Sequence, residues 1–247
     1  MVQAGTANPT EFPAHCPYYV KSPNPLLYAF SKHGCPVVPI MSQYACAKKI
    51  HNQAKEKPMP ALFIDRDGVM NLMLYYADWG EYESPRTPDE YQLLPRVLDA
   101  LTALQADGWQ LFLISNQPGH AKGKITMQAQ QDVHARFVSL LGDIRFTEYY
   151  YSYTHPKGVV PEYTGESPFR KPNPGFLWQA KADYQLDLSQ CWMVGDCDTD
   201  VECGQQAGCR TALITYPYTA YKRQGKIVPD LICADFPDFV SQLRQIK

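Results

Sequence analysis

The sequence lacks any apolar run of the length that a membrane-spanning helix requires. Its start, Met1-Val2-Gln3-Ala4, shows no basic and apolar segments of a secretion signal. A formal net charge of −2 without an evident basic stripe disfavours bulk binding to nucleic acid or to anionic membranes. We therefore expect a cytoplasmic protein, a monomer, with neither a nucleic-acid nor a membrane partner.

Zinc-binding cysteine patterns are also lacking, although the chain has eight cysteines. Half of them recur every six residues, which is not a spacing of zinc ligands: Cys191, Cys197, Cys203 and Cys209. Three others share the first 51 residues with three histidines, but no metal-binding motif connects them. We expect reduced and mostly buried thiols, and a redox function of Cys197 stays open.

Neither an internal repeat nor a low-complexity tract divides the chain, but its composition changes near residue 58. Closely spaced prolines before that point leave only short apolar clusters between them. We interpret residues 1–58 as an N-terminal extension that wraps the domain or is partly disordered. Residues 59–247 have the length of one large α/β domain.

Strand and helix patterns alternate along this domain. Apolar runs typical of buried strands occur at 61–64, 109–114, 146–153, 192–194, 211–215 and near 231. Helical patterns occur at 91–107, 126–141 and 199–206, and begin near 173 and 237. Residues 72–89 form an aromatic and polar loop between them. The alternation predicts an α/β fold with a doubly wound parallel sheet and helices on both faces.

The first predicted strand, 61–64, runs directly into Asp65-Arg66-Asp67-Gly68. Residues two apart in an extended chain point the same way, so Asp65 and Asp67 should face one pocket at the carboxyl end of the sheet. Two carboxylates this close repel each other. The pattern therefore indicates either a nearby cation or a shared proton.

Polar residues follow two other predicted strands. Ser115-Asn116 and Asp196 end these strands, and Arg170-Lys171 lies in a loop before a helix. In a doubly wound sheet the carboxyl ends of the strands form one rim, where ligands bind. We expect all of these side chains to meet there.

The residue types suit phosphoryl transfer. Asp65 and Asp196 can hold Mg²⁺, which prefers oxygen ligands, while Ser115 and Lys171 can donate to phosphate oxygens. Asp65 can attack phosphorus and become an aspartyl-phosphate. Asp67 can protonate the leaving alkoxide and later deprotonate the water that clears the intermediate.

At this point the chain resembles a known family. Residues 63–71, Phe-Ile-Asp-Arg-Asp-Gly-Val-Met-Asn, are similar to the first motif of haloacid dehalogenase superfamily phosphatases. Residues 114–117 resemble the second motif, 170–175 the third, and Asp196 with Asp200 the fourth. All four occur in order between residues 61 and 215. More narrowly, they resemble the branch that holds D-glycero-D-manno-heptose 1,7-bisphosphate 7-phosphatase and histidinol-phosphatase.

The resemblance implies a haloacid dehalogenase-like, Rossmann-like core without a large cap domain, so residues 59–247 would be a phosphatase domain whose site is covered by loops. It implies Asp65 and Asp67 as catalytic residues. The implied cofactor is Mg²⁺, held by Asp65, Asp67 and Asp196. Phosphate or substrate would be bound by Ser115, Asn116, Arg170 and Lys171. Contact of Asp200 with the metal stays open.

The chain departs from the family in one loop. Many relatives hold a structural zinc before the third motif, in a Cys-x-His and Cys-x-Cys pattern. Aligning 155–158 of this chain with their equivalent places four residues at the ligand positions: Ser152, Thr154, Ser167 and Phe169. None of these is a good zinc ligand, so we expect no zinc and a loop held by packing.

The sequence therefore favours a Mg²⁺-dependent phosphomonoesterase acting on a small phosphorylated metabolite, with a sugar phosphate as the expected partner. D-glycero-D-manno-heptose 1,7-bisphosphate is the first expectation, within carbohydrate metabolism, and histidinol phosphate the second. A polynucleotide 3′-phosphatase is a further alternative, which the net acidity disfavours. A phosphate-binding scaffold protein without catalysis is the non-enzymatic alternative.

Overall fold

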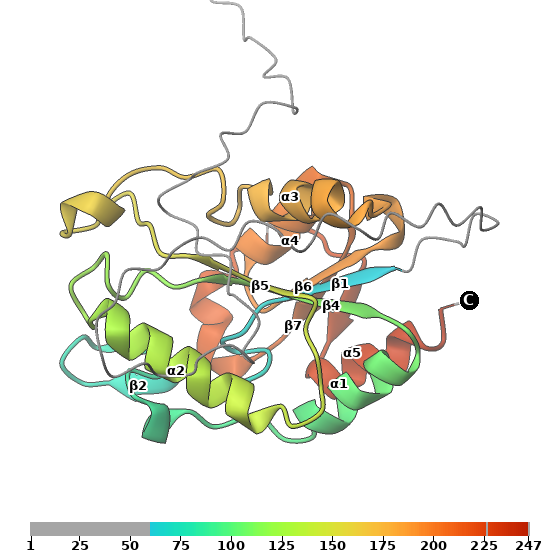
Figure 1. Cartoon of the computed structure of the whole chain (residues 1–247), viewed down its shortest axis with the longest axis horizontal. Coiled ribbons are helices and arrows are strands. Elements are labelled where there is room, and N and C mark those ends of the chain that lie inside the picture. The colour runs from blue at the N-terminus through green and yellow to red at the C-terminus, as the bar shows by residue number, and fades with distance from the viewer. Residues whose placement is uncertain (1–59, 226, 247) are drawn as a thin grey trace, which may run out of the picture.

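A computed structural model describes residues 60–225 and 227–246, so the predictions made for residues 1–58 lie outside the described part. Six parallel strands form one sheet in the order β5-β4-β1-β6-β7-β8, with helices on both faces (Figure 1). The strands are β1 (Ala61–Ile64), β4 (Gln110–Asn116), β5 (Glu148–Ser152), β6 (Trp192–Gly195), β7 (Arg210–Ile214) and β8 (Leu231–Cys233). The helices are α1 (Val97–Ala106), α2 (Met127–Leu140), α3 (Gly175–Tyr184), α4 (Asp198–Ala207) and α5 (Phe236–Leu243). The predicted doubly wound α/β fold is confirmed.

Strand β1 lies in the middle of the sheet, paired with β4 on one side and with β6 on the other. All four of its residues are fully buried, because both faces are covered. From β1 the chain builds β4 and β5 in one direction, then returns to build β6, β7 and β8 in the other. The carboxyl end of β1 is therefore the point where the strand order reverses, which is where open α/β sheets bind ligands.

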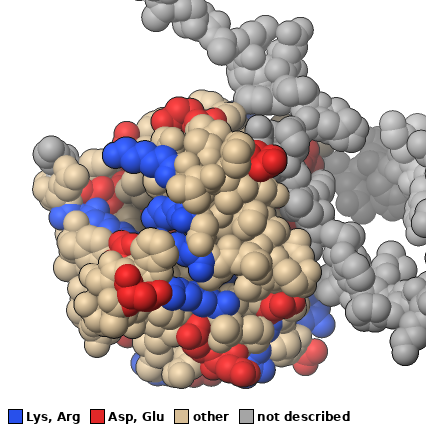
Figure 2. Space-filling view, turned by 90° about the vertical axis from the view of Figure 1, so that its left-hand side faces the viewer, with Lys and Arg blue, Asp and Glu red and all other residues tan. Residues whose placement is uncertain are grey.

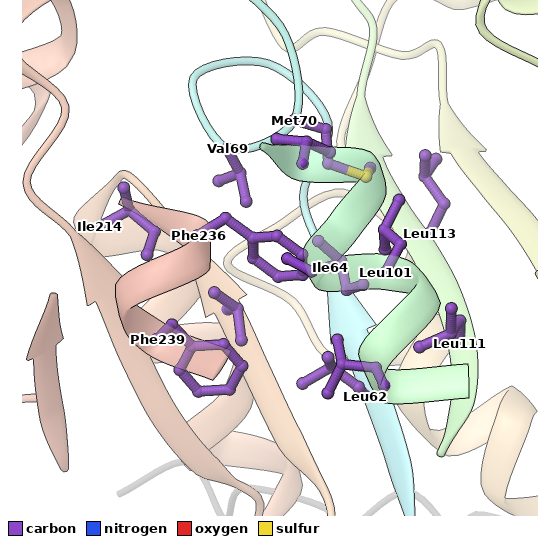
Figure 3. Close-up of a cluster of buried hydrophobic side chains, with 14 of the residues drawn as sticks. Leu62, Ile64, Val69, Met70, Leu101, Leu111, Leu113, Ile214, Phe236 and Phe239 are labelled. Carbon is purple, nitrogen blue, oxygen red and sulfur yellow. The ribbon is translucent and has the colours of Figure 1, made fainter. Parts of the chain in front are cut away.

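Two hydrophobic clusters hold the helices against the sheet. Helices α1, α2 and α5 cover one face, where Leu62 and Ile64 of β1 pack with Leu101, Phe236 and Phe239 (Figure 3). Helices α3 and α4 cover the other face. The alternation of side chains along β1 sends residues 61 and 63 to this second cluster and residues 62 and 64 to the first.

The sequence-based boundaries were wrong in two places. The helix expected from Tyr91 begins only at Val97, because Arg96 has a left-handed backbone with φ of 60°. Tyr91 is instead buried against Phe137 of α2, with ring centroids 5.9 Å apart. Residues 72–89, expected as a loop, contain an antiparallel hairpin of β2 (Leu74–Tyr76) and β3 (Glu81–Glu83).

Within residues 60–225 and 227–246, none of the helices has the length and apolar character needed to cross a membrane.

Candidate active site

The carboxyl ends of β1, β4 and β6 open into a cavity of about 320 Å³. All seven residues that the sequence predicts for the site line this cavity: Asp65, Asp67, Ser115, Asn116, Arg170, Lys171 and Asp196. Figure 2 views the molecule from this end, and Lys and Arg side chains gather across the middle of that face. The structure thus brings together residues that are up to 131 positions apart in the chain (196 minus 65).

Asp65 lies where β1 ends, and its backbone N–H still donates to Val194 of β6. Its Oδ1 accepts from the Arg66 N–H at 2.7 Å and forms an ion pair with Lys171 Nζ at 2.9 Å. Burial, together with the nearby carboxylates of Asp200, Asp196 and Asp67, raises the pKa of Asp65 to about 7, although Lys171 acts in the opposite direction. Asp65 is therefore a carboxylate that a further cation would stabilise in its charged form.

Asp67 has different surroundings from Asp65. The Arg66 guanidinium lies 3.2 Å from both of its oxygens. Asn71 donates to Oδ1 at 2.9 Å, and Ser84 and Gln117 donate to Oδ2 at 2.8 and 2.5 Å. Burial alone would raise the pKa of this carboxyl, but Arg66 and the three hydrogen bonds outweigh it and lower the pKa.

Lys171 connects the carboxylate of Asp65 with that of Asp200. Its Nζ donates to the Ile114 carbonyl at 2.9 Å and pairs with Asp65 and, at 2.6 Å, with Asp200. Burial disfavours the charged amine, but the carboxylates of Asp200 and Asp65 outweigh it and raise the pKa of Lys171 above its usual value. Lys171 therefore stays protonated and positions the Asp65 carboxylate.

The remaining predicted residues, Ser115, Asn116 and Arg170, each have a hydrogen-bond partner. Ser115 is buried at the end of β4, and its Oγ accepts from Gln117 Nε2 at 3.0 Å. Asn116 exchanges two hydrogen bonds with the backbone of Lys171, at 3.0 and 3.1 Å. This amide positions Lys171. Arg170 lines the cavity while one of its nitrogens donates to the Thr154 carbonyl at 3.0 Å.

The residues around Asp196 fit a divalent metal ion. Asp196 is only 1% exposed, yet its Oδ2 has no hydrogen-bond partner. Burial and the Asp200 carboxylate raise the pKa of Asp196, since both penalise a second negative charge there. Gly68, with φ of +80°, leaves room for this carboxylate: a Cβ at position 68 would lie 2.1 Å from Oδ2. An unpartnered carboxylate oxygen beside Asp65 is the donor chemistry that Mg²⁺ prefers.

Sequence reasoning missed the walls of the cavity. The hairpin contributes Glu81, Tyr82, Glu83 and Ser84, and the loops after β4 and β7 contribute Lys122, Tyr221 and Lys222. Lys124 pairs with both hairpin glutamates and lies 4.5 Å from the Trp79 ring centroid. No motif marks these residues in the sequence, although two lysines and two glutamates at alternate positions, 122/124 and 81/83, are a weak signal for paired elements.

The hairpin also contacts the loop after β7. Tyr82 stacks on Tyr218 with ring centroids 4.6 Å apart, and the Tyr221 hydroxyl donates to the Tyr82 carbonyl at 3.3 Å. Ser84 connects the end of the hairpin to Asp67. The hairpin is thus a wall joined to the loops after β4 and β7.

Hydrogen bonds and ring packing hold the loop before the third motif. At the four positions where relatives were expected to hold zinc, the Ser152 and Thr154 hydroxyls lie 3.3 Å apart, and Ser167 accepts from the Phe169 N–H at 3.2 Å. The Phe169 ring packs on Phe176 at a centroid distance of 4.9 Å. These contacts show how side chains other than zinc ligands fill this loop.

Comparisons with known proteins agree with this architecture. A family described as HAD-hydrolase-like matches residues 168–239. The chain is 36% identical over 183 residues to a D-glycero-D-manno-heptose-1,7-bisphosphate 7-phosphatase of Chlorobaculum tepidum, a match that covers 70% of this chain and 88% of the relative. It is 32% identical to D-glycero-beta-D-manno-heptose-1,7-bisphosphate 7-phosphatase of Escherichia coli, covering 64% of this chain and 80% of the relative.

Solved structures show the same similarity. The crystal structure of D,D-heptose 1,7-bisphosphate phosphatase from B. bronchiseptica, complexed with magnesium and phosphate, has a TM-score of 0.65 and 26% identity. It matches 76% of this chain and 100% of that one. A putative HAD-like phosphatase from Mesorhizobium loti has a TM-score of 0.62 and 28% identity, covering 79% of this chain and 91% of that one. The chain therefore belongs to the haloacid dehalogenase-like phosphatases, in the branch of the heptose bisphosphate phosphatases.

Proposed function

We propose that this protein is a Mg²⁺-dependent phosphatase that hydrolyses the 7-phosphate of D-glycero-D-manno-heptose 1,7-bisphosphate. The relatives' names supply the substrate. The observation that carries the proposal is the cavity itself, where Asp65 and the unpartnered Asp196 carboxylate lie beside Lys171 and Ser115. Carboxylates that need a cation, next to donors for phosphate oxygens, are what phosphoryl transfer requires.

In this proposal Asp65 is the nucleophile. Lys171 holds one of its oxygens at 2.9 Å, so the carboxylate is oriented before substrate arrives. Attack on phosphorus forms an aspartyl-phosphate and releases the sugar alkoxide. Asp65 and Asp196 would hold Mg²⁺, with Asp67 as the third proposed ligand, and the ion would neutralise charge on the transferring phosphoryl group.

Asp67 serves as the general acid and then as the general base. Its carboxylate lies on the same cavity as Asp65, and Arg66, Asn71 and Gln117 fix its orientation. The acid step requires the protonated form of Asp67, which Arg66 and the hydrogen bonds disfavour. In that form Asp67 gives its proton to the leaving alkoxide, and the carboxylate so formed takes a proton from the water that hydrolyses the aspartyl-phosphate. Ser115 and Lys171 donate to phosphoryl oxygens, and Asn116 acts by positioning Lys171.

An anionic substrate agrees with the charges at the cavity. Three cationic side chains line it outside the Asp65 centre, Lys122, Arg170 and Lys222, alongside the carboxylates of Glu81 and Glu83. These three cations can contact the phosphate groups of a ligand even though the whole chain is slightly acidic. The proposed substrate is therefore a small sugar phosphate. Action as a cytoplasmic monomer without a structural zinc stays a prediction.

The test is phosphate release by the full-length chain with Mg²⁺ from heptose bisphosphate, histidinol phosphate, a 3′-phosphorylated oligonucleotide and a generic aryl phosphate. We expect the highest kcat/KM for heptose bisphosphate. Asp65→Asn should abolish release, because the amide cannot attack phosphorus, whereas Asp99→Asn, an exposed carboxylate on α1, should not change it. A higher kcat/KM for another ester would show that the substrate assignment is wrong. If no ester releases phosphate, the phosphatase proposal is wrong and a phosphate-binding scaffold protein remains.

A further inference from the structure

Cys197 places a thiol beside the carboxylates of the proposed metal site. Its Sγ lies 3.1 Å from Asp196 Oδ1, and one ligand atom from each of Asp196, Cys197 and Asp200 lies within 4.8 Å of the others. Among the described cysteines, Cys197 alone lines the cavity, and the other four are buried elsewhere. The site therefore offers a sulfur ligand as well as oxygen ligands.

A second, independent observation shows that a ligand position is free. The Asp196 Oδ2 atom is buried without a hydrogen-bond partner. Asp200 is already committed, because its Oδ1 pairs with Lys171 and its Oδ2 accepts from the Cys197 N–H at 3.0 Å. The Asp196 carboxylate and the Cys197 sulfur are thus the groups that an incoming cation would meet together.

Sulfur changes which cations this pair of residues favours. Mg²⁺ binds oxygen ligands and waters, whereas Zn²⁺ and Cd²⁺ bind thiolate strongly. We propose that Cys197 and Asp196 form a site for a thiophilic divalent cation, Zn²⁺ or Cd²⁺, that overlaps the magnesium site. Binding forms a metal–sulfur bond and releases the thiol proton to solvent, with no change of oxidation state. The overlap rests on the proposed function, and its consequence is reversible inhibition of the phosphatase by these ions.

Cadmium alone, added to the full-length protein without substrate, is the probe. Cadmium–thiolate bonds absorb in the ultraviolet, so binding can be followed separately from activity. We expect Cys197→Ser to lose the absorbance of about one thiolate and to weaken Cd²⁺ binding by about tenfold or more. Cys203→Ser is the matched control: Cys203 lies on α4, whose N-cap is Cys197, and is fully buried outside the cavity lining, with its thiol donating to the Asn173 carbonyl. This control should bind Cd²⁺ as the wild type does.

Competition and alkylation complete the test. Excess Mg²⁺ should displace the Cd²⁺ that Cys197 binds, and Cd²⁺ should slow alkylation of the Cys197 peptide in the wild-type chain, measured by mass spectrometry. This second measurement serves if Cys197→Ser does not fold. Identical Cd²⁺ spectra and affinities for Cys197→Ser and wild type, or unchanged alkylation, would overturn the proposal.

The same preparation separates this proposal from the proposed function. Hydrolysis of a phosphate ester with Mg²⁺, but without Cys197-dependent Cd²⁺ binding, would overturn the thiol site and support the phosphatase. Cys197-dependent Cd²⁺ binding without any hydrolysis would support the thiol site and overturn the phosphatase.

Discussion

Asp65 and Asp67 stand two residues apart on the same cavity, yet their surroundings are opposite. Asp65 shares its end of the site with the carboxylates of Asp196 and Asp200, against the ammonium groups of Lys171 and, near Asp196, of Lys222. Asp67 faces the guanidinium of Arg66 and three further donors. The pKa of Asp65 is raised to about 7, and that of Asp67 is lowered.

This difference shows where the protein balances charge by itself and where it does not. The Asp67 end is complete, because every charge there has a partner of the opposite sign or a hydrogen bond. The Asp65 end carries more carboxylates than ammonium groups and a carboxylate oxygen without a partner. A cation from solution would complete it, which is the arrangement that the proposed magnesium-dependent reaction needs.

Lys171→Met should have the largest effect, because it removes the ammonium that pairs directly with Asp65 and Asp200 at the unbalanced end. We expect activity to fall by about 10²–10³-fold, as when a donor to the transition state is removed. Unfolding by urea should show a loss of roughly 3–5 kcal/mol in metal-free buffer, the cost of leaving buried carboxylates unpaired. Added Mg²⁺ should recover part of this stability.

Lys181→Met is the control for this variant, since Lys181 is exposed on α3. It should keep wild-type activity and stability. A Lys171→Met protein as stable as wild type, and unaffected by Mg²⁺, would contradict the view that the Asp65 end lacks positive charge.

Arg66→Gln removes the cation that pairs with the Asp67 carboxylate. Arg66 is 2% exposed and also lies 5.8 and 5.7 Å from the ring centroids of Tyr91 and Tyr151. Without it the Asp67 carboxylate stays buried without its cation, and we expect a loss of about 3 kcal/mol in the free energy of unfolding. Mg²⁺ should restore less of this loss than in Lys171→Met, because Asp67 is only one of the three proposed ligands. Arg66→Lys, which keeps the charge, should lose less, and equal losses for both variants would argue for packing alone.

The floor of the cavity could be predicted from the sequence, for a physical reason. Asp65 and Asp196 follow buried strands, Ser115 lies near the end of another, and parallel strands end at the same edge of a sheet. Position relative to the strand is enough to bring them together. The order of strands and the covering of both faces follow from the same alternation of elements.

The partners of these residues could not be predicted in the same way. Neighbouring side chains in an extended chain point in opposite directions, so the sequence gives no reason to pair Arg66 with Asp67. The pair forms because the chain leaves the strand at residue 64 and bends. The contact of Ser84 with Asp67 depends on the hairpin, whose three-residue strands are too short for a periodic pattern.

Ser84→Ala tests how far the hairpin contributes to the balanced end. Its Oγ donates to Asp67 Oδ2 at 2.8 Å, while Asn71, Gln117 and Arg66 contact Asp67 independently. We expect a loss of about 1 kcal/mol in stability and at most about a tenfold decrease in kcat. Ser139→Ala, whose hydroxyl bonds only within α2, should leave kcat unchanged. A loss of stability as large as that of Arg66→Gln would show that the hairpin contact contributes as much as the Arg66 ion pair to stabilising Asp67.

His134 lies behind Arg66 at the Asp67 end of the site. Its substitution should have the smallest effect on stability at neutral pH. Its Nδ1 lies 2.9 Å from the Tyr151 hydroxyl, and burial together with Arg66 lowers its pKa from 6.5 to about 4. The unfolded chain takes up a proton near pH 6.5, but the folded chain does not until about pH 4. Stability should therefore fall as pH decreases through this window, by up to about 3 kcal/mol from this group. In His134→Gln that contribution is absent. The free energy of unfolding, measured with urea from pH 7 to pH 4.5, should therefore decrease less steeply with pH than in the wild type. Parallel slopes would mean that His134 is protonated in the folded protein, and that a second positive charge beside Arg66 is tolerated.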